Sequence, residues 1–196
     1  MFNHRHKGSI IKMNIYSIVP HSSNWRNLIV YQNNNDRLME YFVFNDNDGS
    51  FLQYIALTGV PQRKIKQDVL DVCDYLKGNI CIPMFSERFV NLMGPILKDE
   101  VLFYPIDIIN DNTHTTFFAT KIIKYMELID DEQTAKAEDK DRENGIMFSS
   151  PIVFQENIAP FLIARDINEP FRWFVSDDFK SICNKNRLRV KFIDNL

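Results

Sequence analysis

A repeated unit of strand, helix cap and helix constrains this chain most strongly. The later copy, residues 171–192, reads FRWFVSDDFKSICNKNRLRVKF, and the earlier copy begins at residue 81 as CIPMFSERF. In each copy an apolar strand leads into a serine, an acidic residue, any residue and a phenylalanine. A serine hydroxyl in this position accepts a hydrogen bond from an otherwise unpaired amide of the first helical turn. The pattern therefore predicts that Ser86 and Ser176 each cap the start of a helix.

The residues after each serine are typical of amphipathic helices. Glu87 in the first copy and the pair Asp177 and Asp178 in the second suit the positive end of a helix dipole. Apolar residues then recur at spacings of three and four: Phe89, Leu92, Met93, Ile96 and Leu97 in the first copy, and Phe179, Ile182 and Cys183 in the second. Each predicted helix has one apolar face. That face needs a sheet to lie on.

Short runs rich in aromatic and branched residues predict the strands of that sheet. They cover residues 14–19, 28–31, 38–44, 51–57, 101–109 and 115–125. Asparagine-rich and aspartate-rich turns separate several of them, which indicates antiparallel hairpins. Apolar residues at helical spacing over residues 65–76 predict a third helix, and Gly78 is a natural place for it to stop.

These elements predict an α+β fold: a mixed, largely antiparallel sheet with about three main helices, two of them in the duplicated strand, cap and helix units. The chain has 196 residues, of which 45% are hydrophobic, so it can bury a sizeable core. We expect a flexible N-terminal tail over residues 1–12 and a single domain over residues 13–196. Within that domain we expect an N-terminal hairpin lobe over about 13–58 and a main lobe over about 59–196.

Composition argues against several classes of partner and site. The formal net charge of −3, without a long basic run, gives no general attraction to nucleic acid. The three cysteines lie in apolar runs and lack the spacing of a zinc site, so we expect neither a metal nor a cofactor. No apolar run reaches the length of a membrane span, and the start lacks a secretory pattern. We therefore expect a cytoplasmic protein without a membrane or nucleic-acid partner.

The segment DDEQTAKAEDKDREN, residues 130–144, is the most polar part of the chain. It has no apolar stripe and predicts a surface loop or an exposed helix. One interpretation is a solvated linker, and the other is an acidic docking surface for a basic protein. Trp25 and Trp173 are candidate anchors of such an interface, although Trp173 fits the core better. The acids of the candidate surface are Asp130, Asp131, Glu132, Glu138, Asp139, Asp141 and Glu143.

Catalytic signatures are few. A serine followed by an acid could be a nucleophile, but neither Ser86 nor Ser176 has the flanking glycines or a nearby histidine base. His114 follows a turn without a second histidine or a cysteine near it in sequence. We therefore expect no catalysis. Two alternatives stay open: a small enzyme that uses carboxylates, and a regulatory module with an apolar pocket between the sheet and the helix predicted over residues 65–76.

The segments IPMFSERFVNLM and WFVSDDFKSICNKNRLRVKF, with FFATKIIKYMELIDDEQT and APFLIARD between them, resemble a family of bacterial polymorphic-toxin immunity proteins that was once catalogued as a domain of unknown function. In that family a strand ending in Ser-Glu or Ser-Asp opens a helix in the middle of the chain and again near its end. An isoleucine-aspartate segment, here Ile129 and Asp130, lies between. The resemblance covers roughly residues 59–192 and brings no catalytic residues.

This resemblance implies a function. An immunity protein of this kind binds a cognate toxin domain and blocks its active site, which protects the cell in interbacterial competition. Many toxin domains that attack nucleic acids are basic, so the acidic segment is the expected contact. The family often has a glycine before the last phenylalanine, where this chain has the run from Arg187 to Val190. That departure leaves the type of toxin open.

Overall fold

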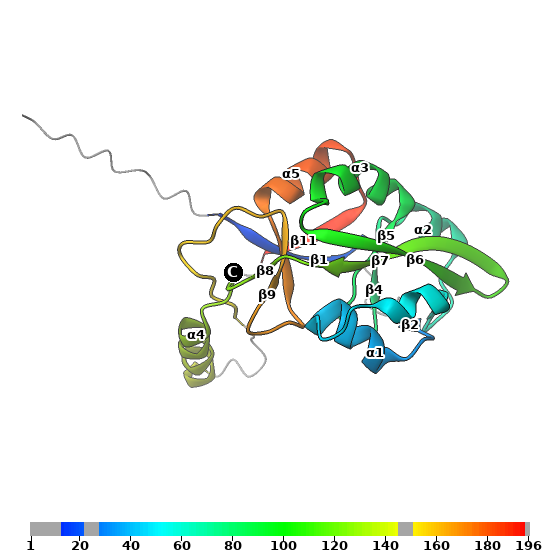
Figure 1. Cartoon of the computed structure of the whole chain (residues 1–196). Coiled ribbons are helices and arrows are strands. Elements are labelled where there is room, and N and C mark those ends of the chain that lie inside the picture. Colours follow the sequence, from blue (N-terminus) through cyan, green and yellow to red (C-terminus); the bar gives the residue numbers. More distant parts are fainter. Residues whose placement is uncertain (1–12, 22–27, 145–150, 195–196) are drawn as a thin grey trace, which may run out of the picture.

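The computed structural model describes residues 13–21, 28–144 and 151–194, and it shows two β-sheets with helices packed against them (Figure 1). The strands are β1 (Ile15–Pro20), β2 (Leu28–Tyr31), β3 (Leu57–Pro61), β4 (Tyr75–Gly78), β5 (Met84–Ser86), β6 (Val101–Asn110), β7 (Thr113–Ile122), β8 (Tyr125–Met126), β9 (Ile163–Asp166), β10 (Trp173–Ser176) and β11 (Val190–Asp194). The α-helices are α1 (Asn35–Met39), α2 (Gln67–Val72), α3 (Glu87–Leu97), α4 (Asp131–Glu143) and α5 (Asp177–Lys185).

One sheet is open and has the strand order β11-β1-β10-β9-β8. Its pairs are antiparallel except for β8 and β9, which are parallel. The second sheet closes into a barrel in the order β2-β3-β6-β7-β5-β4, with parallel pairs β2–β4 and β3–β6. The α+β class and the mixed pairing are therefore confirmed. In place of one sheet with three main helices, the described residues form two sheets and five α-helices.

Both duplicated units have the predicted local structure. The Ser86 hydroxyl accepts a hydrogen bond from the Phe89 amide at 3.1 Å, and the Ser176 hydroxyl accepts one from the Phe179 amide at 3.3 Å. Behind these caps, α3 and α5 bury their apolar faces in a shared core, where the rings of Phe89 and Phe179 lie 6.0 Å apart. Figure 1 shows the two helices side by side above the sheets. The two copies of the unit thus meet in one core.

The long hairpin of β6 and β7 was also predicted from its sequence. It pairs ten residues of each strand, from Val101 opposite Ile122 to Asn110 opposite Thr113. Within the barrel, β6 pairs with β3 and β7 pairs with β5. This hairpin therefore joins the N-terminal strands of the barrel to the first duplicated unit.

Two predicted strands are wrong. Residues 38–44 are helical, with α1 running into a π-helical turn, Glu40–Phe44. Their apolar residues Leu38, Tyr41 and Phe42 fall at helical spacing and are buried against the barrel core. Most of residues 51–57 belongs to a 3₁₀ turn, Ser50–Tyr54, and the strand begins only at Leu57. Aromatic content suggested strands here, whereas the spacing of the buried residues favours helix.

The helix predicted over residues 65–76 is only partly correct. α2 ends at Val72, because Cys73 is already extended and the chain then enters β4. β4 pairs with both β2 and β5, so its backbone groups are satisfied by neighbouring strands. β2 is distant from β4 in sequence, and the local spacing carries no signal for that pairing.

The two lobes expected from the sequence, residues 13–58 and 59–196, both contribute strands to each of the two sheets. Residues 13–58 contribute β1 to the open sheet and β2 to the barrel, and the boundary expected near residue 58 falls inside β3. The expected tail, residues 1–12, and Trp25 lie outside the described residues. No helix in the described ranges is long and apolar enough to cross a membrane.

Candidate functional site

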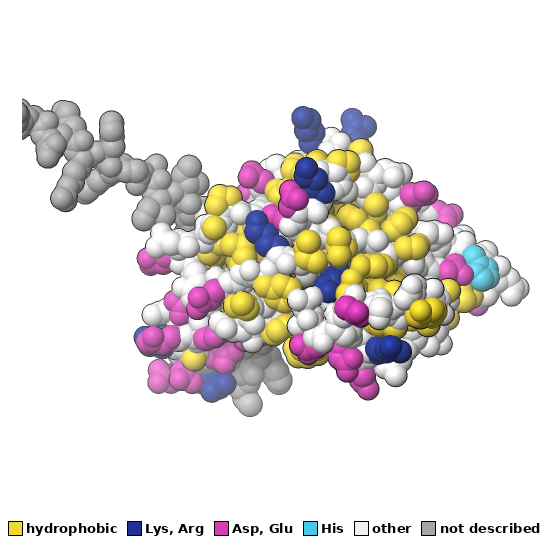
Figure 2. All heavy atoms as spheres, viewed as in Figure 1, with side chains coloured by type: hydrophobic (Ala, Val, Ile, Leu, Met, Phe, Trp, Pro, Cys, Tyr) yellow, Lys and Arg dark blue, Asp and Glu magenta, His cyan; other side chains and the backbone are white. Residues whose placement is uncertain are grey.

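The acidic segment is a helix that stands apart from the body of the protein. α4 begins after Asp130, whose carboxylate caps the helix by accepting a hydrogen bond from the Gln133 amide at 2.9 Å. None of the thirteen residues of α4 is buried. Figure 1 shows the helix projecting away from both sheets, and Figure 2 shows acidic side chains gathered over the same corner. The exposed-helix alternative for this segment is therefore the one that the structure adopts.

Charge on α4 is negative on balance. The helix carries six acidic and three basic side chains. Two of the bases form pairs within the helix: Lys136 with Glu132 at 2.6 Å, and Arg142 with Asp139 at 3.2 Å. Such exposed pairs contribute about 0.3–0.5 kcal/mol each to helix stability. They hold the helix together while the surface as a whole stays acidic.

The base of α4 is fixed by backbone hydrogen bonds. The Asp130 amide donates to the Val153 carbonyl at 2.8 Å, and the Gln155 amide donates to the Leu128 carbonyl at 2.9 Å. One turn into the helix, the Thr134 hydroxyl accepts a hydrogen bond from the Val153 amide at 3.0 Å. The segment around Val153 thus clamps the first turn of the helix.

Asp166, a residue of β9, holds the chain that leads into this clamp. Its side chain is fully buried, and one carboxylate oxygen accepts the amides of Leu128 at 2.9 Å and Ile129 at 3.0 Å. The other oxygen accepts the amides of Asn168 and Glu169. Four backbone donors satisfy the buried charge, as a carboxylate in the interior requires.

The structure brings all seven predicted acids together on one helix and its cap. It also adds two that sequence reasoning missed. Glu127 and Glu156 are exposed and, with Asp130, line an open hollow at the foot of α4. These two residues come from segments on either side of the helix. Glu127 lies three positions before Asp130 in the sequence, whereas only the fold brings Glu156 to the same hollow.

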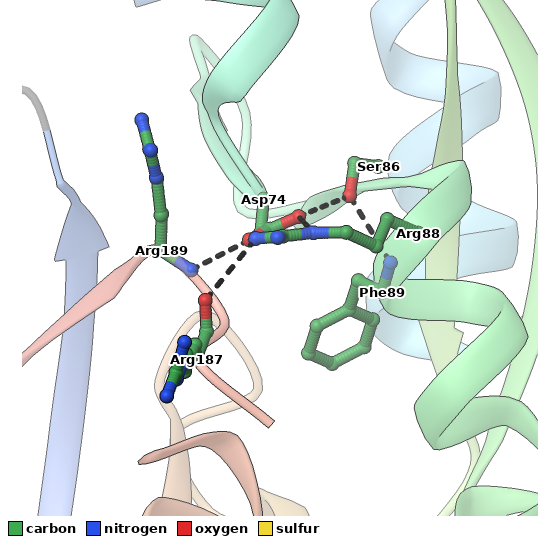
Figure 3. A network of polar contacts seen from close by, with 6 residues as sticks. All are labelled: Asp74, Ser86, Arg88, Phe89, Arg187 and Arg189. Atoms are coloured by element: carbon green, nitrogen blue, oxygen red, sulfur yellow. Dashed lines mark hydrogen bonds and ion pairs between the residues drawn. The ribbon is translucent and has the colours of Figure 1, made fainter. Parts of the chain in front are cut away.

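The Ser86 cap belongs to a polar network centred on Asp74 (Figure 3). The Asp74 carboxylate accepts hydrogen bonds from the Ser86 hydroxyl at 2.6 Å, from Arg88 Nε at 3.1 Å and from the Arg189 amide at 2.5 Å. Arg88 pairs with the same carboxylate through Nη2 and also donates to the Arg187 carbonyl. The network therefore ties the start of α3 to the end of α2 and to the strand β11.

Electrostatics favours a structural role for this network. Burial alone would raise the pKa of Asp74, but hydrogen bonds from Arg88, the Arg189 amide and Ser86 outweigh it and lower the pKa. A carboxylate with a lowered pKa is a weak base, so Asp74 is poorly suited to activate Ser86 as a nucleophile. The Ser86 hydroxyl is also occupied twice, as a donor to Asp74 and as the acceptor for the helix.

The remaining candidate residues lie elsewhere. His114, on the β6–β7 hairpin, contacts Asp107 through Nδ1 at 2.6 Å, and both side chains are exposed. Trp173 is partly buried and packs against the core, with its ring 6.0 Å from that of Tyr75. Within the described ranges, no group of three or more His, Cys, Asp or Glu side chains is placed to hold a metal ion.

The fold and this surface define a class: an α+β protein with an open sheet and a six-stranded barrel, from which an acidic helix projects. Neither the scan against protein-family models nor the search of the curated proteins found a match to this chain.

Proposed function

We propose that this protein is an immunity protein that binds a basic toxin domain through α4 and blocks the toxin's active site. The proposal places it in the cytoplasm, without chemistry of its own. α4 carries this proposal, because it is a long, acidic helix that buries none of its residues. The choice of a toxin as the partner comes from the family resemblance of the two serine-capped units.

The exposure of α4 needs a physical reason. Most helices in proteins are stabilised by the packing of an apolar face, and a short helix without such a face is marginal in water. α4 is stabilised by its Asp130 cap, by its charge pairs and by the clamp at Val153. A helix of this kind contributes little to the core of the molecule. Its surface is instead available to a partner.

Charge makes a basic partner the best match. The six acids of α4 lie beside the exposed Glu127 and Glu156 at its foot, so the negative surface is larger than the helix alone. Complementary charge speeds association and selects among partners. The anchored base, held by Asp166, limits the freedom that the helix would lose on binding.

We expect a toxin domain to be encoded beside the gene for this chain, and the test uses that domain. Its affinity for the full-length protein is measured by titration calorimetry, and its inhibition by a toxin activity assay. The test variant carries Asp139→Lys, Asp141→Lys and Glu143→Lys. These positions lie in the last turns of α4, where lysine is favourable to the helix dipole, and circular dichroism checks that the helix is retained without the pair of Arg142 with Asp139.

A control variant carries Asp46→Lys, Asp99→Lys and Asp194→Lys, three exposed acids of the body that change the net charge equally. We expect the α4 variant to lose at least about 100-fold in affinity, or about 2.7 kcal/mol, and the control variant less than tenfold. Equal effects of the two variants would show that only net charge matters. Full inhibition by the α4 variant would remove the helix from the interface.

A further inference from the structure

A pocket between the open sheet and the barrel lies apart from α4 and has the dimensions of a small-molecule site. It has a volume of about 350 Å³. β1 and β10 of the open sheet line it with Ile18 and Trp173, and the barrel side contributes Tyr75, Lys77 and Cys81. Pockets of this size with mostly apolar walls and a few polar groups are typical of ligand sites.

Aromatic rings form much of the pocket wall. Tyr75 and Trp173 meet edge to face, with ring centroids 6.0 Å apart and an interplanar angle of 71°. Phe171 also lines the pocket, and 51% of its surface is exposed although the ring is large and apolar. A flat aromatic ligand would cover these rings and remove their apolar surface from water, which would stabilise the complex.

The charge of the pocket is positive although the whole chain is acidic. Its charged lining residues are Lys77 and Arg172, and no Asp or Glu lines it. Arg172 is paired with Glu169, which lies outside the lining. Lys77 has an exposed side chain on β4 and is the basic group best placed to meet a ligand.

A third cation lies directly behind the wall. Arg165 is fully buried, donates to the carbonyl of Cys81 at 3.1 Å and to that of Pro170, and leaves Nε without an acceptor. No carboxylate among the described residues forms an ion pair with it. Burial lowers its pKa to about 10, and its guanidinium stays charged at neutral pH. A buried charge without an opposite charge is costly, so it favours an anion on the other side of the wall.

We propose that this pocket binds a small planar anion: an aromatic ring system that carries one oxyanion group. The ring packs against Trp173 and Tyr75, and the oxyanion faces Lys77. This site is independent of the proposed toxin contact, because its lining residues and those at the foot of α4 are different sets.

The test compares two fluorescent probes that differ in charge. 8-Anilinonaphthalene-1-sulfonate is anionic and has a flat naphthalene ring system that carries an anilino ring, and N-phenyl-1-naphthylamine has the same rings without the sulfonate. Each is titrated into the full-length protein, and the dissociation constant is taken from the rise in probe emission. We expect one site for the anionic probe and at least about tenfold weaker binding of the neutral one.

Two matched variants locate the probe. Lys77→Glu reverses the charge at the pocket, and Lys191→Glu reverses an exposed lysine on β11 that does not line it. We expect Lys77→Glu to raise the dissociation constant of the anionic probe at least about tenfold. We expect Lys191→Glu to raise it less than twofold. Circular dichroism and thermal melts of both variants check that the fold is retained. The proposal would be overturned if the two variants weakened binding of the anionic probe equally, or if neither variant weakened it.

Cys81 gives a second, independent readout. It lines the pocket and is partly exposed, whereas Cys73 and Cys183 are buried. Iodoacetamide should therefore react first at Cys81 in the native protein, and mass spectrometry identifies the modified residue. We expect the saturating anionic probe to slow alkylation of Cys81 at least about fivefold. An unchanged rate would mean that the probe binds outside this pocket and would refute the assignment.

Discussion

Replacement of Asp74 with alanine should be among the most destabilising changes in this chain. The Asp74 side chain is 2% exposed and accepts hydrogen bonds from three elements of the fold. Asp74→Ala leaves the Ser86 hydroxyl and the Arg189 amide without their charged acceptor. Arg88 is less affected, because its side chain is 50% exposed and can turn to water.

The magnitude follows from these partners. Each part-buried donor that loses its acceptor costs about 1–3 kcal/mol, and the half-exposed Arg88 adds little. Two such donors, the Ser86 hydroxyl and the Arg189 amide, give an expected loss of about 2–6 kcal/mol in the free energy of unfolding for Asp74→Ala. Arg88→Ala leaves the carboxylate with two of its three partners, so we expect about 1–2 kcal/mol. Urea unfolding at pH 7, followed by circular dichroism, measures both values.

The effect should depend on pH in a defined direction. The pKa of Asp74 is lowered in the folded protein, so the unfolded chain takes up the proton first as the pH falls. The carboxylate thus stabilises the fold above the ordinary aspartate pKa of about 3.9, and this contribution is lost as the pH falls through the lowered value. The difference between wild type and Asp74→Ala should shrink below about pH 4.

Three results would refute this reasoning. They are a larger loss of stability for Arg88→Ala than for Asp74→Ala, a loss below about 1 kcal/mol for Asp74→Ala, and a difference between wild type and Asp74→Ala that stays constant down to pH 3. Asp99→Asn serves as a control, because Asp99 is an exposed acid on the surface, and we expect it to change stability by less than about 0.5 kcal/mol.

Four further substitutions test other parts of the fold. Ser86→Ala and Ser176→Ala should each lower the unfolding free energy by about 1–2 kcal/mol through loss of a helix cap, and a loss near zero in urea titrations would contradict the capping role. Asp166→Ala should speed hydrogen exchange of the Leu128 and Ile129 amides at least tenfold, whereas unchanged exchange would show that other contacts hold the base of α4. Gly59→Ala should cost about 1–3 kcal/mol in thermal melts, because a Cβ there would lie 2.7 Å from Ile29 Cγ2, and a neutral effect would mean that the barrel wall yields easily.

Local signals explain what could be predicted. Ser86 and Ser176 were found because a helix cap needs a side chain and an amide only three residues apart. The β6–β7 hairpin was found because its strands are joined by a short turn. The exposure of α4 was found because a segment without an apolar stripe has no face to bury.

The acidic surface around α4 could be predicted only in part, because only some of its residues are marked by a local signal. The acids of α4 lie in one segment of the sequence and stood out by composition, whereas Glu156 joins them only through the fold. Nothing in the sequence around Arg165 showed that it would be buried without a carboxylate partner. That depends on the Cys81 carbonyl, which lies 84 positions away along the chain.

The sequence by itself determined the helix caps, the long hairpin, the α+β class and the polar character of α4, since each depends on residues within a few positions of one another. Only the tertiary structure decided that β4 cuts α2 short and that six strands close into a barrel. It also decided the environment of Asp74, whose amide partner at Arg189 is 115 positions away. Strand pairing and buried polar contacts depend on tertiary contacts between segments that are distant in sequence. Local sequence patterns carry no information on those contacts.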